Sequence, residues 1–416
     1  MAEAATHRAV EAVWRIEAAR VVAGLAGVVR DIGVAEELAQ DALVAALEQW
    51  PETGVPRNPG AWLMAVGKRR AIDLVRRRQR LERRIEEIGR DLHDQEPAPE
   101  FVEDPIEDDL LRLVFTACHP VVPPHGRVAL TLRMLGGLTT TEIARAFLVP
   151  ESTVAQRIVR AKRTLAQARV PFEVPGPGER PERLASVLEV IYLVFNEGYS
   201  ATQGDDWMRP ALCEEALRLG RVLAGLVPDE PEVHGLVALM EIQASRSAAR
   251  TGPSGEPILL LDQDRSRWDR LLIRRGLAAL ERAETLGDEP GPYTVQAAIA
   301  ACHARALRPE DTDWARIAGL YGVLAERSPS PVVELNRAVA VSMAEGPAVG
   351  LALVDGLTDE PALREYHLLP SVRGDLLVKL GRREEARAEF ERAASLTRNE
   401  RERTLLMERA RAVTES

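Results

Sequence analysis

The sequence predicts an all-α protein with two small helical domains followed by a long helical extension. Apolar residues recur at spacings of three and four along most of the 416 residues, which is the period of an α-helix. Pro and Gly residues separate these stretches, and residues 138–168 carry start signals for two consecutive helices. We expect domains at 1–82, 110–170 and 182–416, joined by a linker at 83–109 and a connector at 171–181.

The first distinctive segment is a helix expected over residues 35–50, which is acidic and partly apolar. Such a helix suits docking on a basic protein surface, with acids and apolar side chains sharing the contact. An amphipathic core helix with a solvated acidic face is the alternative. The residues assigned to the contact are Glu36, Glu37, Gln40, Asp41, Leu43, Leu47 and Trp50.

A loop rich in Pro, Gly and Asn at 51–59 leads into a strongly basic helix. From Lys68 to Arg84, nine Lys or Arg stand against two acids, a local balance of +7. Nucleic acid or an acidic protein is the natural partner of such a surface, although a cation run is often only a solvated helix face. The residues assigned to DNA contact here are Arg57, Asn58, Trp62, Lys68, Arg69, Arg70, Arg76 and Arg77.

The next segment has the opposite charge. From Glu86 to Asp109 there are eleven acids and one Arg, a balance of −10, and three Pro residues interrupt any helix. This composition predicts a linker. It could also lie across the basic surfaces when DNA is absent, although mutual solvation is the simpler explanation.

Residues 138–168 predict a helix-turn-helix. Thr139 and Glu142 form a capping box at the first helix, and Pro150 suits a position near the start of the second. Leu148 lies where many such motifs use Gly to reach a positive φ, so we expect a different turn geometry. The apolar positions are Ile143, Ala144 and Phe147 in the first helix and Val154, Ile158 and Leu165 in the second.

Along the polar face of the second helix, the residue types come in the order expected of a helix that reads DNA. Short hydrogen-bonding residues at its start can reach base edges, and the cations that follow can hold phosphates. An ordinary helical hairpin with a solvated polar face is the alternative. The assigned residues are Glu151, Ser152, Thr153, Gln156, Arg157, Arg160 and Arg163.

More than half of the chain follows the Pro/Gly connector. Its sequence predicts nearly continuous helix. Helical periodicity is found at 183–195, 211–226, 232–249, 268–286, 293–305, 313–326, 331–344, 347–357 and 362–412. Near the end, five small or aromatic residues fall at the spacing of a tetratricopeptide unit, and a looser copy lies at 216–228. These residues are Gly374, Gly381, Ala386, Phe390 and Ala393. They predict tetratricopeptide-like (TPR-like) helical pairs, with a plain helical bundle as the alternative.

Three segments of the extension, at 192–201, 261–270 and 330–340, look too particular in sequence for generic helix. They predict either an internal polar network between stacked helices or a site that faces a partner. The residues concerned are Asn196, Glu197, Asp262, Asp264, Arg267, Trp268, Asn336 and Arg337.

The order of these parts resembles an extracytoplasmic-function (ECF) RNA polymerase sigma factor, of the subgroup with a TPR-like C-terminal extension. The resemblance implies a sigma-2 domain that grips core RNA polymerase through 35–50 and meets −10 promoter DNA through 51–80. Its loop 51–59 would hold a flipped base of the melted non-template strand, with Thr53, Arg57 or Asn58 lining the pocket. A sigma-4 domain at 110–170 would read double-stranded −35 DNA. Such extended sigma factors are often accompanied by a small YCII-related protein, which is a further expected partner.

Composition narrows the remaining function classes. Long apolar runs and a signal peptide are not evident, so we expect a cytoplasmic protein without a membrane partner. Cys118, Cys213 and Cys302 are far apart in sequence, which favours reduced, packed thiols and no metal site. We find no catalytic constellation, no phosphate loop and no calcium loop, and so expect no enzyme activity and no cofactor.

Two rival interpretations use the same residues. One is an operator-binding helix-turn-helix regulator with a helical domain that senses a ligand or a partner. It needs neither the acidic helix at 35–50 nor the basic helix that follows. The other treats 180–416 as a scaffold to which the DNA-binding domains are attached.

Overall fold

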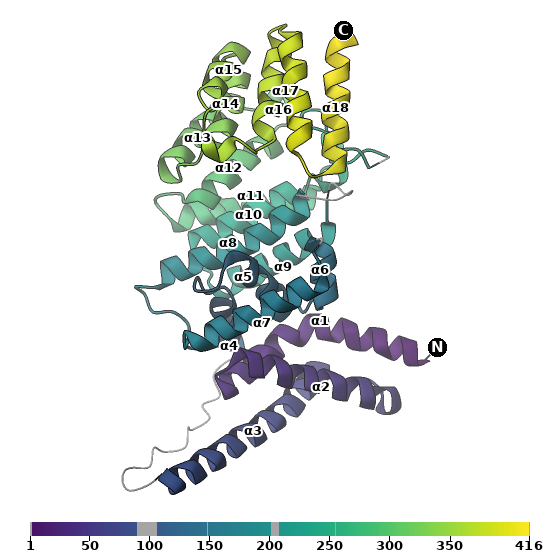
Figure 1. The fold of residues 1–416 in the computed structure, drawn as a ribbon, viewed down its shortest axis with the longest axis vertical. Helices are drawn as coiled ribbons and strands as arrows, with labels where there is room; N and C mark the ends of the chain where they lie inside the picture. The colour runs from purple at the N-terminus through teal and green to yellow at the C-terminus, as the bar shows by residue number, and fades with distance from the viewer. Residues whose placement is uncertain (1, 90–105, 148, 201–207, 254, 416) are drawn as a thin grey trace. The chain divides into compact units, whose positions relative to one another are not determined.

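The computed structural model describes residues 2–89, 106–147, 149–200, 208–253 and 255–415. Within these ranges the chain forms eighteen α-helices, four short 3₁₀ helices and no strand, so the all-α prediction is confirmed (Figure 1). The chain divides into two compact units, Met1–Ile191 and Tyr192–Ser416.

The first three helices form the N-terminal module: α1 (Ala2–Val29), α2 (Ile32–Thr53) and α3 (Pro59–Gly89). Asp31 caps α2 by accepting hydrogen bonds from the backbone N–H groups of Gly33 and Val34, at 2.8 and 3.1 Å. Gly54 ends α2 with a φ of +80°, a backbone conformation that favours glycine. Helix thus occupies residues 83–89 of the predicted acidic linker, and α4 occupies its last residues from Ile106.

The helix-turn-helix module comprises α4 (Ile106–Ala117), α5 (Pro124–Met134), α6 (Thr140–Phe147) and α7 (Glu151–Gln167). The predicted capping box forms: Glu142 accepts from the Thr139 N–H at 2.8 Å, and the Thr139 hydroxyl accepts from the Glu142 N–H at 3.1 Å. Pro150 is the N-cap of α7, one residue earlier than predicted, because its ψ of 143° is extended. The expectation about Leu148 lies outside the described residues.

The helix α8 (Arg180–Tyr199) begins in the first unit and ends in the second. Its first half completes the core of the helix-turn-helix module. Arg183 donates to the Phe115 carbonyl at 2.9 Å, and the Ser186 hydroxyl donates to the Cys118 carbonyl at 2.5 Å. The compact units therefore divide inside α8, whereas the sequence placed the start of the extension at 182.

Ten further α-helices build the second unit: α9 (Pro210–Leu226), α10 (Pro231–Ala244), α11 (Arg270–Leu286), α12 (Pro292–Arg305), α13 (Trp314–Arg327), α14 (Pro331–Glu345), α15 (Pro347–Asp355), α16 (Leu368–Lys379), α17 (Arg383–Leu396) and α18 (Glu400–Glu415). The 3₁₀ helices are Ser247–Ala249, Arg265–Arg267, Pro309–Asp311 and Pro361–Leu363. Five of the α-helices start with Pro at the first helical position, where its missing N–H is not needed.

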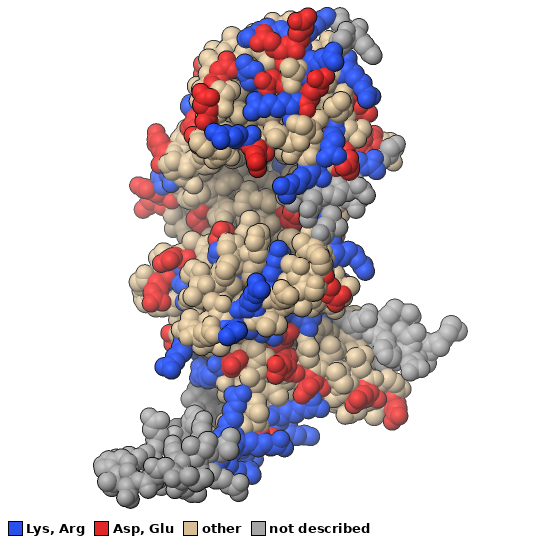
Figure 2. Space-filling view, in the orientation of Figure 1, with Lys and Arg blue, Asp and Glu red and all other residues tan. Residues whose placement is uncertain are grey.

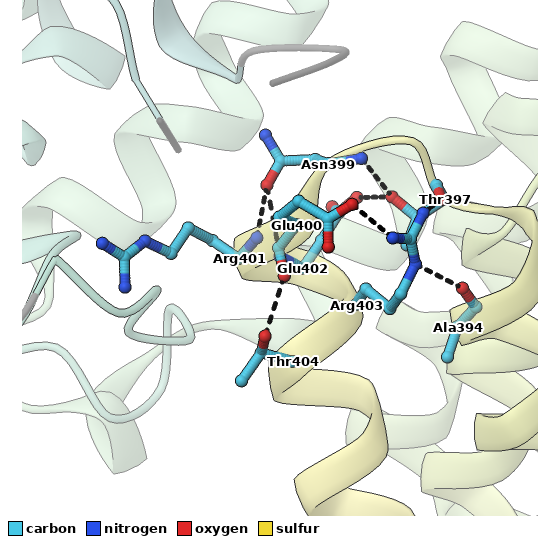
Figure 3. Close-up of polar contacts among 8 residues, drawn as sticks. All are labelled: Ala394, Thr397, Asn399, Glu400, Arg401, Glu402, Arg403 and Thr404. Atoms are coloured by element: carbon cyan, nitrogen blue, oxygen red, sulfur yellow. Dashed lines mark hydrogen bonds and ion pairs between the residues drawn. The ribbon is translucent and has the colours of Figure 1, made fainter. Parts of the chain in front are cut away.

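The periodic stretch 362–412 folds mainly as three α-helices, α16, α17 and α18. Gly381, with a φ of +75°, makes the turn between α16 and α17. The next turn is closed by polar contacts: Asn399 accepts from the Arg401 N–H at 3.0 Å, and the Thr397 hydroxyl donates to Glu402 at 2.6 Å (Figure 3). Buried polar groups in this turn are thereby paired.

Consecutive helices of the second unit pack against each other, and small residues permit close approach. A methyl group on Gly374 of α16 would lie 2.8 Å from the ring of Phe390 on α17, closer than side chains normally come. Two of the five residues in the predicted repeat thus meet at a helix crossing. Among the described helices, none combines the length and apolar character needed to cross a bilayer.

Candidate nucleic-acid interface

The outer face of α7 is a polar surface that the fold leaves open. Val154, Ile158, Ala161 and Leu165 are buried and hold the helix against the rest of the module. On the other side, Glu151, Ser152, Gln156, Arg160 and Arg163 are exposed, and Thr153 and Arg157 are half-buried. All seven predicted DNA-contacting residues of this helix are therefore at least partly accessible.

Charge on the α7 face is available for a ligand. Arg157, Arg160 and Arg163 form no ion pair with the described residues. Glu151 accepts a hydrogen bond from the Thr141 hydroxyl at 2.9 Å, which joins the starts of α6 and α7. The motif thus presents three uncompensated guanidinium groups from a helix whose N-terminal end is fixed by local hydrogen bonds.

A second cationic surface runs along α3 of the N-terminal module. Figure 2 shows Lys and Arg side chains gathered along this helix. Arg70 pairs with Asp41 of α2 at 3.1 Å, and the other predicted cations of α3 make no ion pair with described residues. The exposed predicted residues are Arg57, Asn58, Lys68, Arg69, Arg70, Arg76 and Arg77.

Two tryptophans join α2 and α3. The rings of Trp50 and Trp62 meet edge to face, with centroids 5.3 Å apart and an interplanar angle of 66°. Trp50 is only 1% exposed, so its indole packs inside the N-terminal module, and Trp62 is half-buried. Trp50 therefore lies inside the N-terminal module rather than on the surface predicted to meet polymerase.

The predicted polymerase-binding residues of α2 differ in accessibility. Glu37 and Asp41 are exposed, and Gln40, Leu43 and Leu47 are half-buried. Glu36 is only 6% exposed. It lies against the helix-turn-helix module, where it accepts a hydrogen bond from Arg133 of α5 at 2.7 Å and forms an ion pair with Lys162 of α7.

Sequence analysis missed Arg133 and Lys162 as partners of Glu36. Burial acts to raise the pKa of the Glu36 carboxyl, but Lys162 and Arg133 outweigh it and hold the pKa below its ordinary value. One signal was present in the sequence. Lys162 falls between Ala161 and Leu165 on the buried side of α7, where a cation needs an acidic partner.

The polar residues of the extension, predicted to form an internal network or a partner-facing site, make separate, local contacts. Glu197 pairs with Arg209, Asp264 caps its own 3₁₀ helix through the Ser266 N–H at 2.9 Å, and Arg337 pairs with Glu334 of the same helix at 2.7 Å. Trp268 is buried in the core, whereas Asp262, Arg267 and Asn336 are exposed.

The second unit also contains buried arginines that bind backbone carbonyls. The sequence analysis did not identify them. Arg265 donates to the carbonyls of His303 and Ala306 at the end of α12, at 2.9 and 2.8 Å. Arg250 donates to the Tyr199 carbonyl at the end of α8 and lies over the Tyr199 ring. Both cations therefore satisfy the carbonyl ends of helices, a structural role.

The three cysteines are buried free thiols. Burial raises the pKa of Cys118 to about 11 and that of Cys213 to about 12, and it also raises the pKa of Cys302. All three are therefore kept protonated and poorly reactive near neutral pH. Within the described ranges, no three His, Cys, Asp or Glu residues gather as metal ligands.

Family comparisons cover both modules and the start of the extension. Residues 16–81 match Sigma-70 region 2, and residues 112–165 match Sigma-70, region 4. Residues 183–284 match a family of unknown function, DUF6596, so the tetratricopeptide interpretation of the extension stays a prediction. No solved structure matches the chain.

Comparison with curated proteins gives relatives of two kinds. An uncharacterized protein of Rhizobium meliloti is 49% identical over 374 residues, covering 89% of this chain and 88% of that protein. The probable ECF RNA polymerase sigma factor SigI of Mycobacterium tuberculosis is 30% identical over 172 residues, covering 40% of this chain and 58% of SigI, less than two thirds of its length. The ECF RNA polymerase sigma factor SigK of the same species is 31% identical over 140 residues, covering 33% of this chain and 73% of SigK. With both sigma-70 regions in order and most of SigK matched, the chain belongs to the ECF RNA polymerase sigma factor family.

Proposed function

We propose that this protein binds core RNA polymerase through α2, helps melt −10 promoter DNA with residues 51–80, and reads −35 DNA with residues 150–163. The extension would regulate these steps. The observation that carries the proposal is the open side of α7, whose three arginines make no ion pair with the residues that the structure describes. As a sigma subunit, the protein would direct initiation without itself catalysing a reaction.

The order of side chains along α7 supports promoter reading. Ser152, Gln156, Arg160 and Arg163 follow one another at spacings of four, four and three, so they lie along one face of the helix. Small polar groups near the helix start suit base edges in the major groove. The arginines suit guanines or phosphates.

The exposed cations of α3 support a role at the −10 element. They lie in the module that precedes the helix-turn-helix, and among the side chains that the structure describes only Arg70 has an ion-pair partner, Asp41. Residues 51–58 before α3 are mostly exposed, so Arg57 and Asn58 are accessible to an unpaired base. Extruding a base costs a few kcal/mol, which such contacts would offset.

Polymerase binding would use the accessible part of α2. Glu37 and Asp41 are exposed one turn apart, and Leu43 and Leu47 are half-buried beside them. An acidic helix with partly exposed leucines fits a basic coiled coil with an apolar seam. The extension's paired helices would supply a further surface for a protein partner, and the expected YCII-related protein remains a prediction.

The test is a pull-down of bacterial core polymerase followed by run-off transcription from the DNA upstream of the gene. Full-length protein is compared with a chain that ends at Ser200. That end point keeps all of α8, whose first half is packed on the helix-turn-helix module through Arg183 and Ser186. A cut in the Pro/Gly connector would instead expose the core of that module.

Initiation that depends on the protein supports the proposal, and a difference between the two chains gives the sign of the extension's effect. Failure of both chains to bind core would contradict it. Specific binding to upstream DNA without core would then favour the operator-binding regulator.

A further inference from the structure

Three arginines and two aromatic rings alternate in a stack inside the second unit. The guanidinium carbon of Arg250 lies 3.5 Å from the centre of the Tyr199 ring, and that of Arg246 lies 5.8 Å from the same ring. Arg246 also lies 5.8 Å from the Trp268 ring, and Arg265 lies 5.1 Å from it. Arg246 is therefore the middle cation of this arginine stack, and the two other arginines are its outer cations.

The outer cations of the arginine stack have hydrogen-bond acceptors. Arg250 donates to the Tyr199 carbonyl. Arg265 donates to the carbonyls of His303 and Ala306, and its other terminal nitrogen donates to the Thr312 hydroxyl at 3.1 Å. Backbone and hydroxyl oxygens thus satisfy both guanidinium groups without a carboxylate.

Arg246 has no such acceptor. It is only 9% exposed, and its side chain makes no hydrogen bond or ion pair with any residue that the structure describes. Its Nε–H is fully buried without a partner. A guanidinium carries five N–H donors, and the faces of two aromatic rings replace only part of the hydration that burial removes. The fold therefore leaves a recessed cation with unused donors.

Two further donors of the arginine stack are also buried without acceptors. They are the Trp268 Nε1–H, in a side chain that is 3% exposed, and the Arg265 Nε–H. The acids Glu310 and Asp311 act to raise the pKa of Arg265, but both pair with Arg308. Among the described side chains, the arginine stack has positive charge and unused donors but no carboxylate paired with it.

The neutral groups around Arg246 add donors rather than negative charge. Burial raises the pKa of Tyr321 to about 12, although the charge of Arg246 opposes this shift. The hydroxyl is therefore protonated at neutral pH, and it makes no hydrogen bond to a described residue. Burial, together with Arg246 and Arg265, lowers the pKa of His303 to about 3, so this ring is neutral. Tyr321 and the neighbouring Tyr192 are half-buried, which leaves the cluster partly accessible from their side.

We propose that Arg246 and Tyr321 form an oxyanion-binding site in the extension, which takes a small ligand that carries a carboxylate or a phosphate group. The planar fork of a guanidinium binds either group through two parallel hydrogen bonds, and a protonated phenol adds a further donor. Because Arg246 is recessed, a small anion fits this position better than the broad surface of a protein. The site gives the extension a chemical input that does not depend on the proposed contacts with polymerase or DNA.

The test is thermal unfolding of the full-length protein in a Tris–chloride buffer near neutral pH. Sodium acetate, sodium phosphate or sodium chloride is added at equal ionic strength. An oxyanion that binds only the folded chain raises the midpoint of unfolding as its concentration rises. The parent protein should show this shift with at least one of the two oxyanions. A shift with acetate identifies a carboxylate site, and a shift with phosphate identifies a phosphate site.

A matched pair of variants separates specific binding from a general salt effect. Phosphate stabilises many proteins because it is excluded from their surface, so the quantity compared is the shift relative to the parent. Arg246→Met removes the charge and keeps a long apolar side chain, and it should abolish the specific shift. Arg274→Met is the control at an exposed position of α11, where the parent side chain has no ion pair with a described residue. It should respond as the parent does.

Two milder variants keep the test available if Arg246→Met does not fold. Arg246→Lys retains the charge but loses the planar fork, and Tyr321→Phe loses one donor. Isothermal titration calorimetry with the oxyanion that shifts the parent should show about tenfold weaker binding for each variant.

Equal shifts in the parent and in Arg246→Met, with both oxyanions, would overturn the inference. So would a loss of stability in Arg246→Met that is the same in all three salts, because Arg246 would then be a structural cation between Tyr199 and Trp268. Neither result bears on the contacts with polymerase and promoter DNA, which the run-off assay tests separately.

Discussion

Arg127 of α5 donates a hydrogen bond to the Glu189 carboxylate of α8 across 2.9 Å, although 62 positions separate the two residues in sequence. The same guanidinium reaches the Ser186 hydroxyl, and the Arg127 side chain is 8% exposed. The first helix of the extension is thus a structural part of the helix-turn-helix module.

Replacing Arg127 with Ala should destabilise the first unit by about 1–3 kcal/mol, because a buried side chain and its hydrogen bonds are lost together. Urea unfolding of the full-length protein measures this change. Arg145→Ala, at an exposed position with no ion pair to a described residue, should stay within about 0.5 kcal/mol of the parent. Equal stability of the two variants would show that α8 does not support the module.

Thr139→Ala should weaken the start of α6 by about 1 kcal/mol, because its hydroxyl accepts from the Glu142 N–H. Thr139→Ser keeps the hydroxyl and should restore most of the loss. Hydrogen exchange of the first amides of α6 reports the change locally. Faster exchange in both variants alike would mean that the threonine methyl, rather than the cap, stabilises this turn.

Replacing Arg157 and Arg160 with Ala should weaken binding to promoter DNA by roughly 1–3 kcal/mol for each guanine contact that is lost. A phosphate contact would instead reduce the salt dependence by about one unit of slope. Fluorescence anisotropy at several salt concentrations separates these cases. Arg387→Ala, whose parent side chain pairs with Glu391 on α17, is the control. An unaltered affinity would argue against α7 as the reading helix.

Gly374→Ala should destabilise the second unit, since the new methyl group would lie 2.8 Å from the Phe390 ring. Gly322→Ala is a matched control in α13, where nothing lies within 4 Å of the new carbon. There the higher helix propensity of Ala should add up to about 1 kcal/mol. Thermal unfolding should therefore shift in opposite directions for the two variants, and a shift in the same direction would contradict the packing described for α16 and α17.

His303 should make the stability of the second unit sensitive to acid. Burial, together with Arg246 and Arg265, lowers its pKa from 6.5 to about 3. The unfolded chain therefore binds a proton between about pH 6.5 and 3 that the folded chain excludes, so stability falls as the pH drops through this window. His303→Phe keeps a ring against Trp314, 5.2 Å away, and should flatten the dependence. Urea unfolding at several pH values compares the slopes, and parallel curves would exclude His303 as the cause.

The elements that sequence predicted best are those with local signals. The capping box at Thr139 and Glu142 and the apolar positions of α7 lie within a few residues of one another, so their pattern is visible without the fold. Gly381 and the cap at Asn399 divide the long periodic stretch at 362–412, and the periodicity by itself does not show these divisions.

Contacts between residues that are far apart in the sequence could not be predicted from its patterns. Glu36 was assigned to the polymerase contact as one of the acids of the 35–50 helix, yet it is buried against Arg133, 97 positions away, and Lys162. The start of α8 looked like the beginning of a separate domain because a Pro/Gly connector precedes it. Only the fold shows that Arg183 and Ser186 donate hydrogen bonds to backbone carbonyls of α4 and of the turn that follows it.

The edge-to-face pair of Trp50 and Trp62 gives this protein a built-in optical reporter. Indole rings 5.3 Å apart couple their electronic transitions, and the resulting circular dichroism depends on their mutual angle. One ring belongs to the helix expected to meet polymerase and the other to the helix expected to meet DNA. Assembly of an initiation complex could therefore be followed from the protein's own chromophores, without a dye.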